Sequence, residues 1–261
     1  MFDYHPSGIW MPHKERPKAI DFFCGAGGFS LGFIEAGFDV VAAVDWDEHA
    51  AITYMANLGS RPIDIHFIDD TDKDRLEKAI QNGLKRNAKA NNGIVTSMPL
   101  SGSGWISHRP DRIPVKHFWM GDVRKLSGQE ILDILGLGHG DIDCVFGGPP
   151  CQGFSTSGKR DVMDPRNSLV FDFARLILEI QPKSFVMENV PGILSMITPE
   201  GIPVEDAFCK ILSDGGFGGF DALKKTLLNT AGAGAALKGQ SSGKRGKEKP
   251  MAAKEEQLAL F

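Results

Sequence analysis

The chain has 261 residues, of which 42% are hydrophobic and 24% are charged, a composition typical of a globular protein with one main core. No segment approaches the roughly 20 consecutive apolar residues of a membrane span, and the N-terminus lacks the pattern of a secretory signal, so we expect a cytoplasmic protein with no membrane partner. The net charge is −4, and residues 1–237 carry −7 because residues 238–250 contribute +4 and residues 251–261 contribute −1; such a body should bind a polyanion weakly unaided.

The first regular segment has the pattern of a strand, a helix and a second strand. Residues 19–23, which are apolar except for Asp21, and the apolar residues 40–44 suit buried strands, and 29–36 has the periodicity of an amphipathic helix. A glycine-rich turn, Cys24-Gly25-Ala26-Gly27-Gly28, joins the first strand to the helix. This order predicts a βαβ unit with the glycine turn after its first strand.

The middle of the chain is less regular. A charged helical segment at 70–90 is followed by asparagine-, glycine- and serine-rich stretches, and we interpret about 60–117 as an insertion. Residues 118–120 then lead to Gly121-Asp122 as the end of a later strand.

Strand and helix patterns alternate again in the following part. Residues 142–146 and 183–187 suit buried strands, and 168–180 suits a helix. Apolar strands that alternate with helices predict an α/β fold with a parallel, doubly wound sheet.

Composition divides the chain into three regions. Residues 1–17 contain three prolines and one glycine without sustained periodicity and are expected to form an irregular arm. Residues 18–228 are expected to form the main domain. Residues 229–261, rich first in Ala and Gly and then in Lys, Gly and Ser, are expected to be a flexible tail.

The glycine turn and the end of the second strand are candidates for binding a ligand. Gly25, Gly27 and Gly28 would let a ligand approach the backbone closely, and Asp45 would accept hydrogen bonds from ribose hydroxyls. The G-x-G-G spacing suits an adenosine-type ligand without a pyrophosphate at least as well as a dinucleotide. The alternative is that these glycines serve only close packing of the helix.

Two further polar or aromatic residues follow predicted strands. Trp46 comes directly after Asp45, where its indole could stack on an adenine, and the carboxylate of Asp122 could accept from an exocyclic amine. Either residue has a structural alternative, since a tryptophan often packs half-buried and an Asp after Gly often makes a turn or helix cap.

The clearest chemical signal is the loop 147–155, Gly-Gly-Pro-Pro-Cys-Gln-Gly-Phe-Ser. It holds the thiol of Cys151 at the carboxyl end of a strand, the edge at which doubly wound folds bind ligands. Glu188 ends the neighbouring strand, so thiol and carboxylate are expected to converge on one crevice. The cysteines show no C-x-x-C pair and no metal-ligand spacing, which predicts neither disulfides nor structural zinc.

Six motifs, in this order, resemble those of the cytosine-5 DNA methyltransferase family: D-F-F-C-G-A-G-G-F-S, V-D-W-D, G-D-V, G-G-P-P-C-Q-G-F-S, D-P-R-N-S-L-V-F and E-N-V-P-G. The resemblance spans about 18–196, interrupted by the insertion. It implies a Rossmann-like methyltransferase fold that uses S-adenosylmethionine to methylate carbon 5 of cytosine in DNA, with 18–228 as the catalytic domain.

The resemblance also implies roles for matching residues. Cys151 would be the catalytic nucleophile, and Glu188 would contact the ring nitrogen of the cytosine. Asp45 would hold the ribose of the cofactor, and Trp46 and Asp122 its adenine. The full set of expected cofactor-binding residues is Phe23, Gly25, Gly27, Gly28, Asp45, Trp46, Asp122, Pro150 and Leu169.

The sequence departs from the family pattern after Gly192, so we expect a fold that is incomplete on its C-terminal side. The family continues with another strand, a Gln-x-Arg-x-Arg motif, a target-recognition domain and a closing helix, none of which is visible here. One interpretation is a split enzyme, in which a second polypeptide supplies the missing half. The alternatives are an inactive remnant that binds cofactor or another protein, and a tRNA-modifying member of the same family.

The last five residues, Gln257 to Phe261, resemble the peptide with which bacterial proteins bind the replicative sliding clamp. An undistinguished apolar C-terminus is the alternative. The expected cytoplasmic location is the bacterial cytosol or the nucleoid. Lys159 and Arg160, just past the Cys151 loop, are either phosphate contacts or a solvated charge pair.

Overall fold

A computed structural model describes residues 2–4, 10–12, 16–90, 101–150, 169–195, 197 and 202–213. Cys151, the charge pair Lys159-Arg160 and the C-terminal peptide therefore lie outside the described residues. Within the described part, no helix is both long and apolar enough to cross a membrane.

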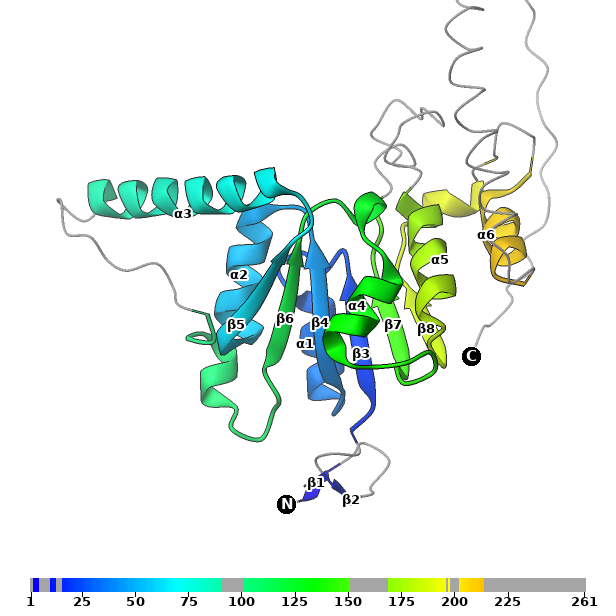
Figure 1. Cartoon of the computed structure of the whole chain (residues 1–261), viewed down its shortest axis with the longest axis horizontal. Coiled ribbons are helices and arrows are strands. Elements are labelled where there is room, and N and C mark those ends of the chain that lie inside the picture. Colours follow the sequence, from blue (N-terminus) through cyan, green and yellow to red (C-terminus); the bar gives the residue numbers. More distant parts are fainter. Residues whose placement is uncertain are drawn as a thin grey trace, which may run out of the picture.

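Six parallel strands form the central sheet (Figure 1). Their spatial order is β5-β6-β4-β3-β7-β8, so β4, β5 and β6 lie on one side of β3, with β6 between β4 and the edge strand β5, and the chain then crosses to the other side of β3 for β7 and β8. The strands, in chain order, are β3 (Lys18–Phe22), β4 (Asp39–Asp45), β5 (Gly59–Phe67), β6 (Val115–Met120), β7 (Cys144–Gly147) and β8 (Ser184–Met187). The predicted parallel, doubly wound sheet is thereby confirmed.

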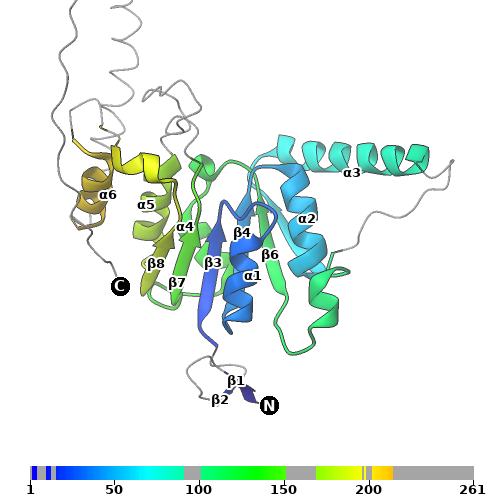
Figure 2. The same cartoon turned by 180° about the vertical axis from the view of Figure 1, so that it is seen from behind.

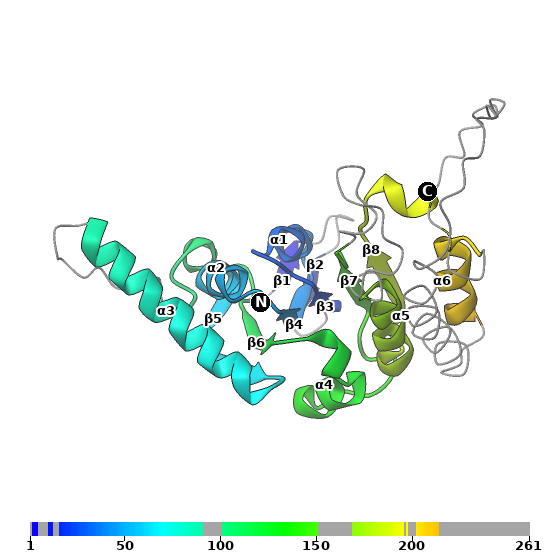
Figure 3. The same cartoon turned by 90° about the horizontal axis from the view of Figure 1, so that it is seen from above.

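Helices cover both faces of this sheet. Figure 2 shows α1 (Gly28–Glu35) and α2 (Glu48–Leu58) on one face, and Figure 1 shows α4 (Gly128–Leu135) and α5 (Leu169–Ile180) on the other. Beside α5 lies α6 (Val204–Ser213), while α3 (Asp70–Ala90) extends away from the body along one side (Figure 3). The described residues also include the short 3-10 turns η2 (Trp105–His108), η3 (Val123–Lys125) and η5 (Pro191–Ser195).

Alternation along each strand produces two separate cores. In β6, Phe118 packs in the core beneath α1 and α2, while the next residue, Trp119, packs in the core beneath α4 and α5. The same alternation holds in β7, where Val145 faces α5 and Phe146 faces α1. Successive side chains of a strand point to opposite faces, so fully apolar strands require helices on both sides.

The structure assigns part of the expected insertion to the sheet. Residues 59–67 form β5, which pairs with β6 over Asp64–Phe67, and α3 is the helix that connects these two strands. Since β5 is an edge strand, it alternates polar and apolar residues and lacks the apolar run of a buried strand. Of the described residues in 60–117, those at 101–114 lie outside β5, α3 and β6.

The N-terminal arm also contains regular structure. Residues Phe2–Tyr4 (β1) pair antiparallel with Trp10–Pro12 (β2). The aromatic residues Tyr4 and Trp10, which have high strand propensity, are register partners in this ladder. Their three-residue length left no sequence periodicity to detect.

Candidate active site

A cavity of about 630 Å³ opens at the carboxyl ends of the strands. Loops that follow β3, β4, β6 and β7 contribute its walls, and the first residue of α5 completes them. This is the edge at which doubly wound sheets bind ligands, and the volume lies in the range of small-molecule sites. The lining residues are Phe23, Asp45, Trp46, Asp47, Gly121, Asp122, Val123, Arg124, Gly148, Pro150 and Leu169.

Phe23 enters this cavity from an unusual backbone conformation. It follows β3 with a φ of 60°, in the left-handed region that bulky residues rarely adopt. Its ring packs at a tilt against Phe173 of α5, with centroids 6.4 Å apart. Backbone strain of this kind concentrates at functional sites, so the conformation supports a role for this wall of the cavity.

Asp45 connects the glycine turn to the end of β4. Its Oδ2 accepts the backbone amide of Gly25 at 2.7 Å, and its Oδ1 accepts the amide of Asp47 at 2.8 Å. Burial raises the pKa of this carboxyl group, and the hydrogen bonds from the backbone amides oppose that shift. Each oxygen keeps a second lone pair, so a held carboxylate can still accept from a hydroxyl in the cavity.

Gly27 and Gly28 are not among the described lining residues. Gly27 has a φ of 96° at the start of α1, and a Cβ there would stand 2.6 Å from Cδ1 of Leu58 and 2.9 Å from Cδ2 of Tyr54. The packing alternative therefore accounts for Gly27, because α2 approaches the turn too closely for any side chain. Around Gly28 there is open space.

Trp46 is 60% exposed at the mouth of the cavity. Arg75 of α3 lies over its indole ring, with the guanidinium carbon 4.2 Å from the ring centroid. The same guanidinium donates to the carbonyl oxygen of Trp46 and to Glu48, each at 2.7 Å. One face of the indole is thus covered by a cation, which leaves the other for a planar ligand.

Asp122 both caps a turn and lines the cavity. Its Oδ1 accepts the backbone amide of Arg124 at 3.0 Å, and both of its oxygens accept from Nε of Arg124 at 2.9 Å. Burial opposes ionisation of this carboxyl, but the hydrogen bonds and charge of Arg124 outweigh it and lower the pKa. The group is therefore a charged acceptor beside Arg124, and the turn-capping alternative holds.

Glu188 lies at the β7 and β8 end of the cavity. Its amide donates to the carbonyl of Gly147 at 2.9 Å, and a Cβ placed on the lining residue Gly148 would stand 3.0 Å from its Oε2. Asn189 reaches the carbonyl of Pro149 at 3.5 Å. The carboxylate thus stands beside the strand end from which the chain continues to Cys151.

Two of the described cysteines are structural. Cys24 and Cys144 are buried, and burial raises the pKa of each thiol, which makes them poor nucleophiles. Cys209 is exposed on α6. In the described ranges no group of three His, Cys, Asp or Glu residues could hold a metal ion.

Six of the nine expected cofactor residues line the cavity, and Gly25 is tied to it through Asp45. Five lining residues were not expected, namely Asp47, Gly121, Val123, Arg124 and Gly148. Four of these five directly adjoin an expected residue or follow it by two positions, so the motifs themselves could have indicated them. Nothing in the sequence indicated Arg75, which is 29 residues from Trp46 and on another element.

The fold and cavity define the class as a Rossmann-like α/β protein with a cavity at the carboxyl edge of its sheet. A family model described as C-5 cytosine-specific DNA methylase matches residues 17–84 and 114–217. The chain belongs to this family, and its fold is the Rossmann-like methyltransferase fold.

Several type II methyltransferases are similar to the chain. M.XorII of Xanthomonas oryzae pv. oryzae is 35% identical over 178 residues, which cover 68% of this chain and 29% of the relative. M.DdeI of Desulfomicrobium norvegicum is 33% identical over 198 residues, which cover 76% of this chain and 34% of the relative. M.HgiGI of Herpetosiphon aurantiacus is 32% identical over 173 residues, covering 66% and 90%. The chain thus spans about a third of the first two relatives and nine tenths of the third.

Proposed function

We propose that this chain transfers a methyl group from S-adenosylmethionine to carbon 5 of cytosine in DNA, with Cys151 as nucleophile, as one part of a split enzyme. The observation that carries the proposal is the cavity at the sheet edge, where the residues of five family motifs meet. Its walls are largely apolar and aromatic, and hydrogen bonds from backbone amides fix the carboxylates of Asp45 and Asp122. This combination suits an adenosine-type ligand.

The cofactor would lie between the walls that the motifs supply. Asp45 would accept from the ribose hydroxyls, the free face of Trp46 would stack on the adenine, and Asp122 would accept from the exocyclic amine. Phe23, Pro150 and Leu169 would supply apolar contact. When bound, the cofactor supplies an activated methyl group on a positively charged sulfur.

Carbon 5 of cytosine is too poor a nucleophile to accept that methyl group directly. In the proposed reaction the Cys151 thiolate forms a bond to carbon 6, and the electrons of the 5,6 double bond move toward N3, where Glu188 donates a proton. Carbon 5 would then bond the methyl group while the bond from that methyl group to the cofactor sulfur breaks, and the electron pair stays on the sulfur of the leaving S-adenosylhomocysteine. A base such as water would take the proton from carbon 5, whose electrons re-form the 5,6 double bond and expel the Cys151 thiolate, and N3 would return its proton to the Glu188 carboxylate.

The target base must leave the duplex for this chemistry. Neither face of a stacked cytosine is accessible, so the nucleotide has to be flipped into the site. The negative charge of residues 1–237 argues that another segment supplies most of the DNA contacts.

The edge strand β8 supports a completing segment. Phe185 and Val186 point to opposite faces of the sheet, yet they are 41% and 44% exposed, and Leu194 just beyond is 64% exposed. The opposite edge, β5, instead carries polar residues such as Arg61 and Asp64. Among the residues that the structure describes, β8 is the last strand on this side of the sheet. Exposed apolar residues on such an edge mark an interaction surface, so we propose that the missing half of the enzyme packs here.

The direct test is methyl transfer from radiolabelled S-adenosylmethionine to duplex DNA, by the chain alone and together with the product of an adjacent reading frame. Activity only in the mixture supports the split enzyme, and activity of the chain alone would remove the need for a partner. No activity in either case favours the inactive remnant. Transfer to tRNA but not to duplex DNA favours the RNA-modifying alternative.

A matched pair of variants tests the docking edge. Val186→Lys should abolish activation by the second polypeptide without lowering the thermal stability of the isolated chain, because Val186 is already exposed. Asp64→Lys, at the opposite edge of the sheet, should leave activation unchanged. Equal activation of both variants would exclude β8 as the interface.

The C-terminal peptide carries a separate proposal, that Gln257 to Phe261 binds the bacterial sliding clamp. Deletion of residues 257–261 should abolish binding to purified clamp in a pull-down. Unchanged binding would dismiss this partner and leave the methyltransferase proposal intact.

A further inference from the structure

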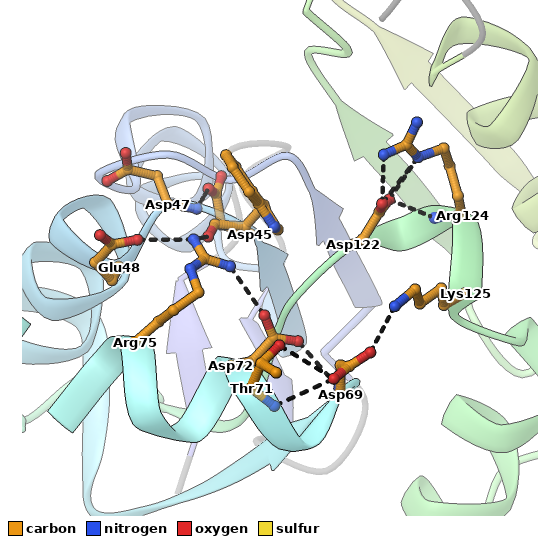
Figure 4. A network of polar contacts seen from close by, with 11 residues as sticks. Asp45, Asp47, Glu48, Asp69, Thr71, Asp72, Arg75, Asp122, Arg124 and Lys125 are labelled. Carbon is orange, nitrogen blue, oxygen red and sulfur yellow. Dashed lines mark hydrogen bonds and ion pairs between the residues drawn. The ribbon is translucent and has the colours of Figure 1, made fainter. Parts of the chain in front are cut away.

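The first turns of α3 contact one wall of the cavity through Arg75. Besides its place over the Trp46 ring and its bonds to the Trp46 carbonyl and Glu48, this guanidinium donates to Asp72 at 2.9 Å. Figure 4 shows Arg75 between Glu48 and Asp72, which hold it from two sides. The cation over Trp46 is therefore fixed by three acceptors rather than free to rotate.

The same turns contact the opposite wall. Asp69, just before α3, accepts from Nζ of Lys125 at 2.5 Å, and Lys125 ends the η3 turn that Asp122 begins (Figure 4). The Lys125 hydrogen bond is the main reason that the pKa of Asp69 falls to about 2. The buried carboxylate of Asp72 lies so close to Gly121 that a Cβ there would collide with it.

One short segment thus connects the end of β4 to the end of β6. Asp72 belongs to both connections, since it holds Arg75 on one side and packs against Gly121, the neighbour of Asp122, on the other. Its Oδ2 also accepts the amide of Asp69 at 3.0 Å, which ties the two sides together.

We propose that Arg75 is a positioning residue for the cofactor, which holds the indole of Trp46 at a fixed spacing from Asp122 so that an adenine fits between them. This inference rests on the proposed function, because it assigns the slot to the adenine of S-adenosylmethionine. Arg75 would act through Trp46, since its guanidinium lies over the indole while Arg75 itself is not among the residues that line the cavity.

The physical reason is preorganisation. A 60% exposed indole without a partner samples several rotamers, and a ligand that stacks on it must immobilise it. Immobilising one such side chain reduces affinity by about 3- to 10-fold. A guanidinium that already holds the ring removes that cost before the ligand arrives.

A double-mutant cycle with S-adenosylhomocysteine as the probe, measured by calorimetry, tests the inference. Arg75→Gln should weaken binding about 3- to 10-fold in the parent chain, and by less than about 2-fold in a Trp46→Ala chain, where there is no ring to hold. Lys73→Gln, an exposed change on the same helix, should leave binding unchanged in both. Thermal unfolding of each variant identifies any general loss of structure.

An equal loss from Arg75→Gln in both backgrounds would mean that Arg75 supports the fold and not the indole, and no loss in the parent would mean that it does neither. Either result overturns the inference while leaving the proposed function standing. If the parent chain failed to bind S-adenosylhomocysteine both alone and together with the completing polypeptide, the proposed function would fail, and this inference with it.

Discussion

Oδ2 of Asp45 accepts the backbone amide of Gly25 at 2.7 Å, so the end of β4 holds the glycine turn that follows β3. These two motifs lie 20 residues apart in the sequence. One carboxylate thereby shapes the turn and faces the cavity, which couples the stability of the turn to ligand binding.

Replacement of this carboxylate should reduce stability and affinity together. Asp45→Ala removes the acceptor of the Gly25 and Asp47 amides, which should cost about 1–3 kcal/mol of unfolding free energy, and should weaken S-adenosylhomocysteine binding at least about 10-fold because a charged acceptor for the ribose is lost. Chemical denaturation and calorimetry measure the two effects.

Asp47→Ala is the matched control. Asp47 lines the same cavity, but its side chain caps α2 by accepting the amides of His49 and Ala50. Its removal should cost about 1 kcal/mol of stability with little change in affinity. An affinity loss as large as that of Asp45→Ala would contradict the assignment of the ribose to Asp45.

The two neighbouring glycines of the turn should respond differently to alanine. Gly27→Ala forces a Cβ into Leu58 and Tyr54 from a left-handed backbone, and should destabilise the chain by about 2 kcal/mol or more. Gly28→Ala meets open space inside α1 and should change stability by less than about 1 kcal/mol. Urea denaturation of both variants measures this difference, and equal midpoints would contradict it.

Asp21 should make stability depend on pH. This fully buried carboxyl accepts from Ser30 at 2.6 Å, and burial raises its pKa from 3.8 to about 8. Between these two pKa values the native chain keeps a proton that the unfolded chain releases. The contribution of Asp21 to the free energy of unfolding is therefore fully present below about pH 4 and is lost as the pH rises through about 8. The slope from this group is roughly 1 kcal/mol per pH unit.

Asparagine does not titrate, so the Asp21→Asn variant should lack this part of the pH dependence of the unfolding free energy. Denaturation of parent and variant at pH 5, 6, 7 and 8 should therefore show the parent losing stability relative to the variant as the pH rises. Parallel curves would mean that Asp21 is ionised in the native chain.

The sequence predicted the central βαβ unit and the strands at 142–146 and 183–187, which the structure shows as β7 (Cys144–Gly147) and β8 (Ser184–Met187). These strands were predictable because short apolar runs between turn signals are typical of buried strands. It also predicted the helix at 70–90. It did not predict β5 as part of the sheet, since Pro62, Asp64 and His66 interrupt the apolar pattern at an edge where one side meets solvent.

The cavity was foreseeable where a motif residue follows a strand, as with Asp45 and Asp122. The contacts that hold those residues were not, because they come from distant segments: Lys125 meets Asp69 across 56 residues, and Arg75 meets Trp46 across 29. These contacts depend on how α3 packs against the rest of the chain, and the local sequence of α3 does not indicate which residues it will contact.

Covalent trapping tests the catalytic role of Cys151 most directly. In DNA with 5-fluorocytosine at the target position, the thiolate can add and the methyl group can transfer, but carbon 5 has no proton to lose, so the thiolate cannot leave. The parent chain, combined with whatever completes it, should form an adduct with this DNA that survives denaturing electrophoresis, and Cys151→Ser should form none while still binding S-adenosylhomocysteine. An adduct of equal yield with Cys151→Ser would contradict the account.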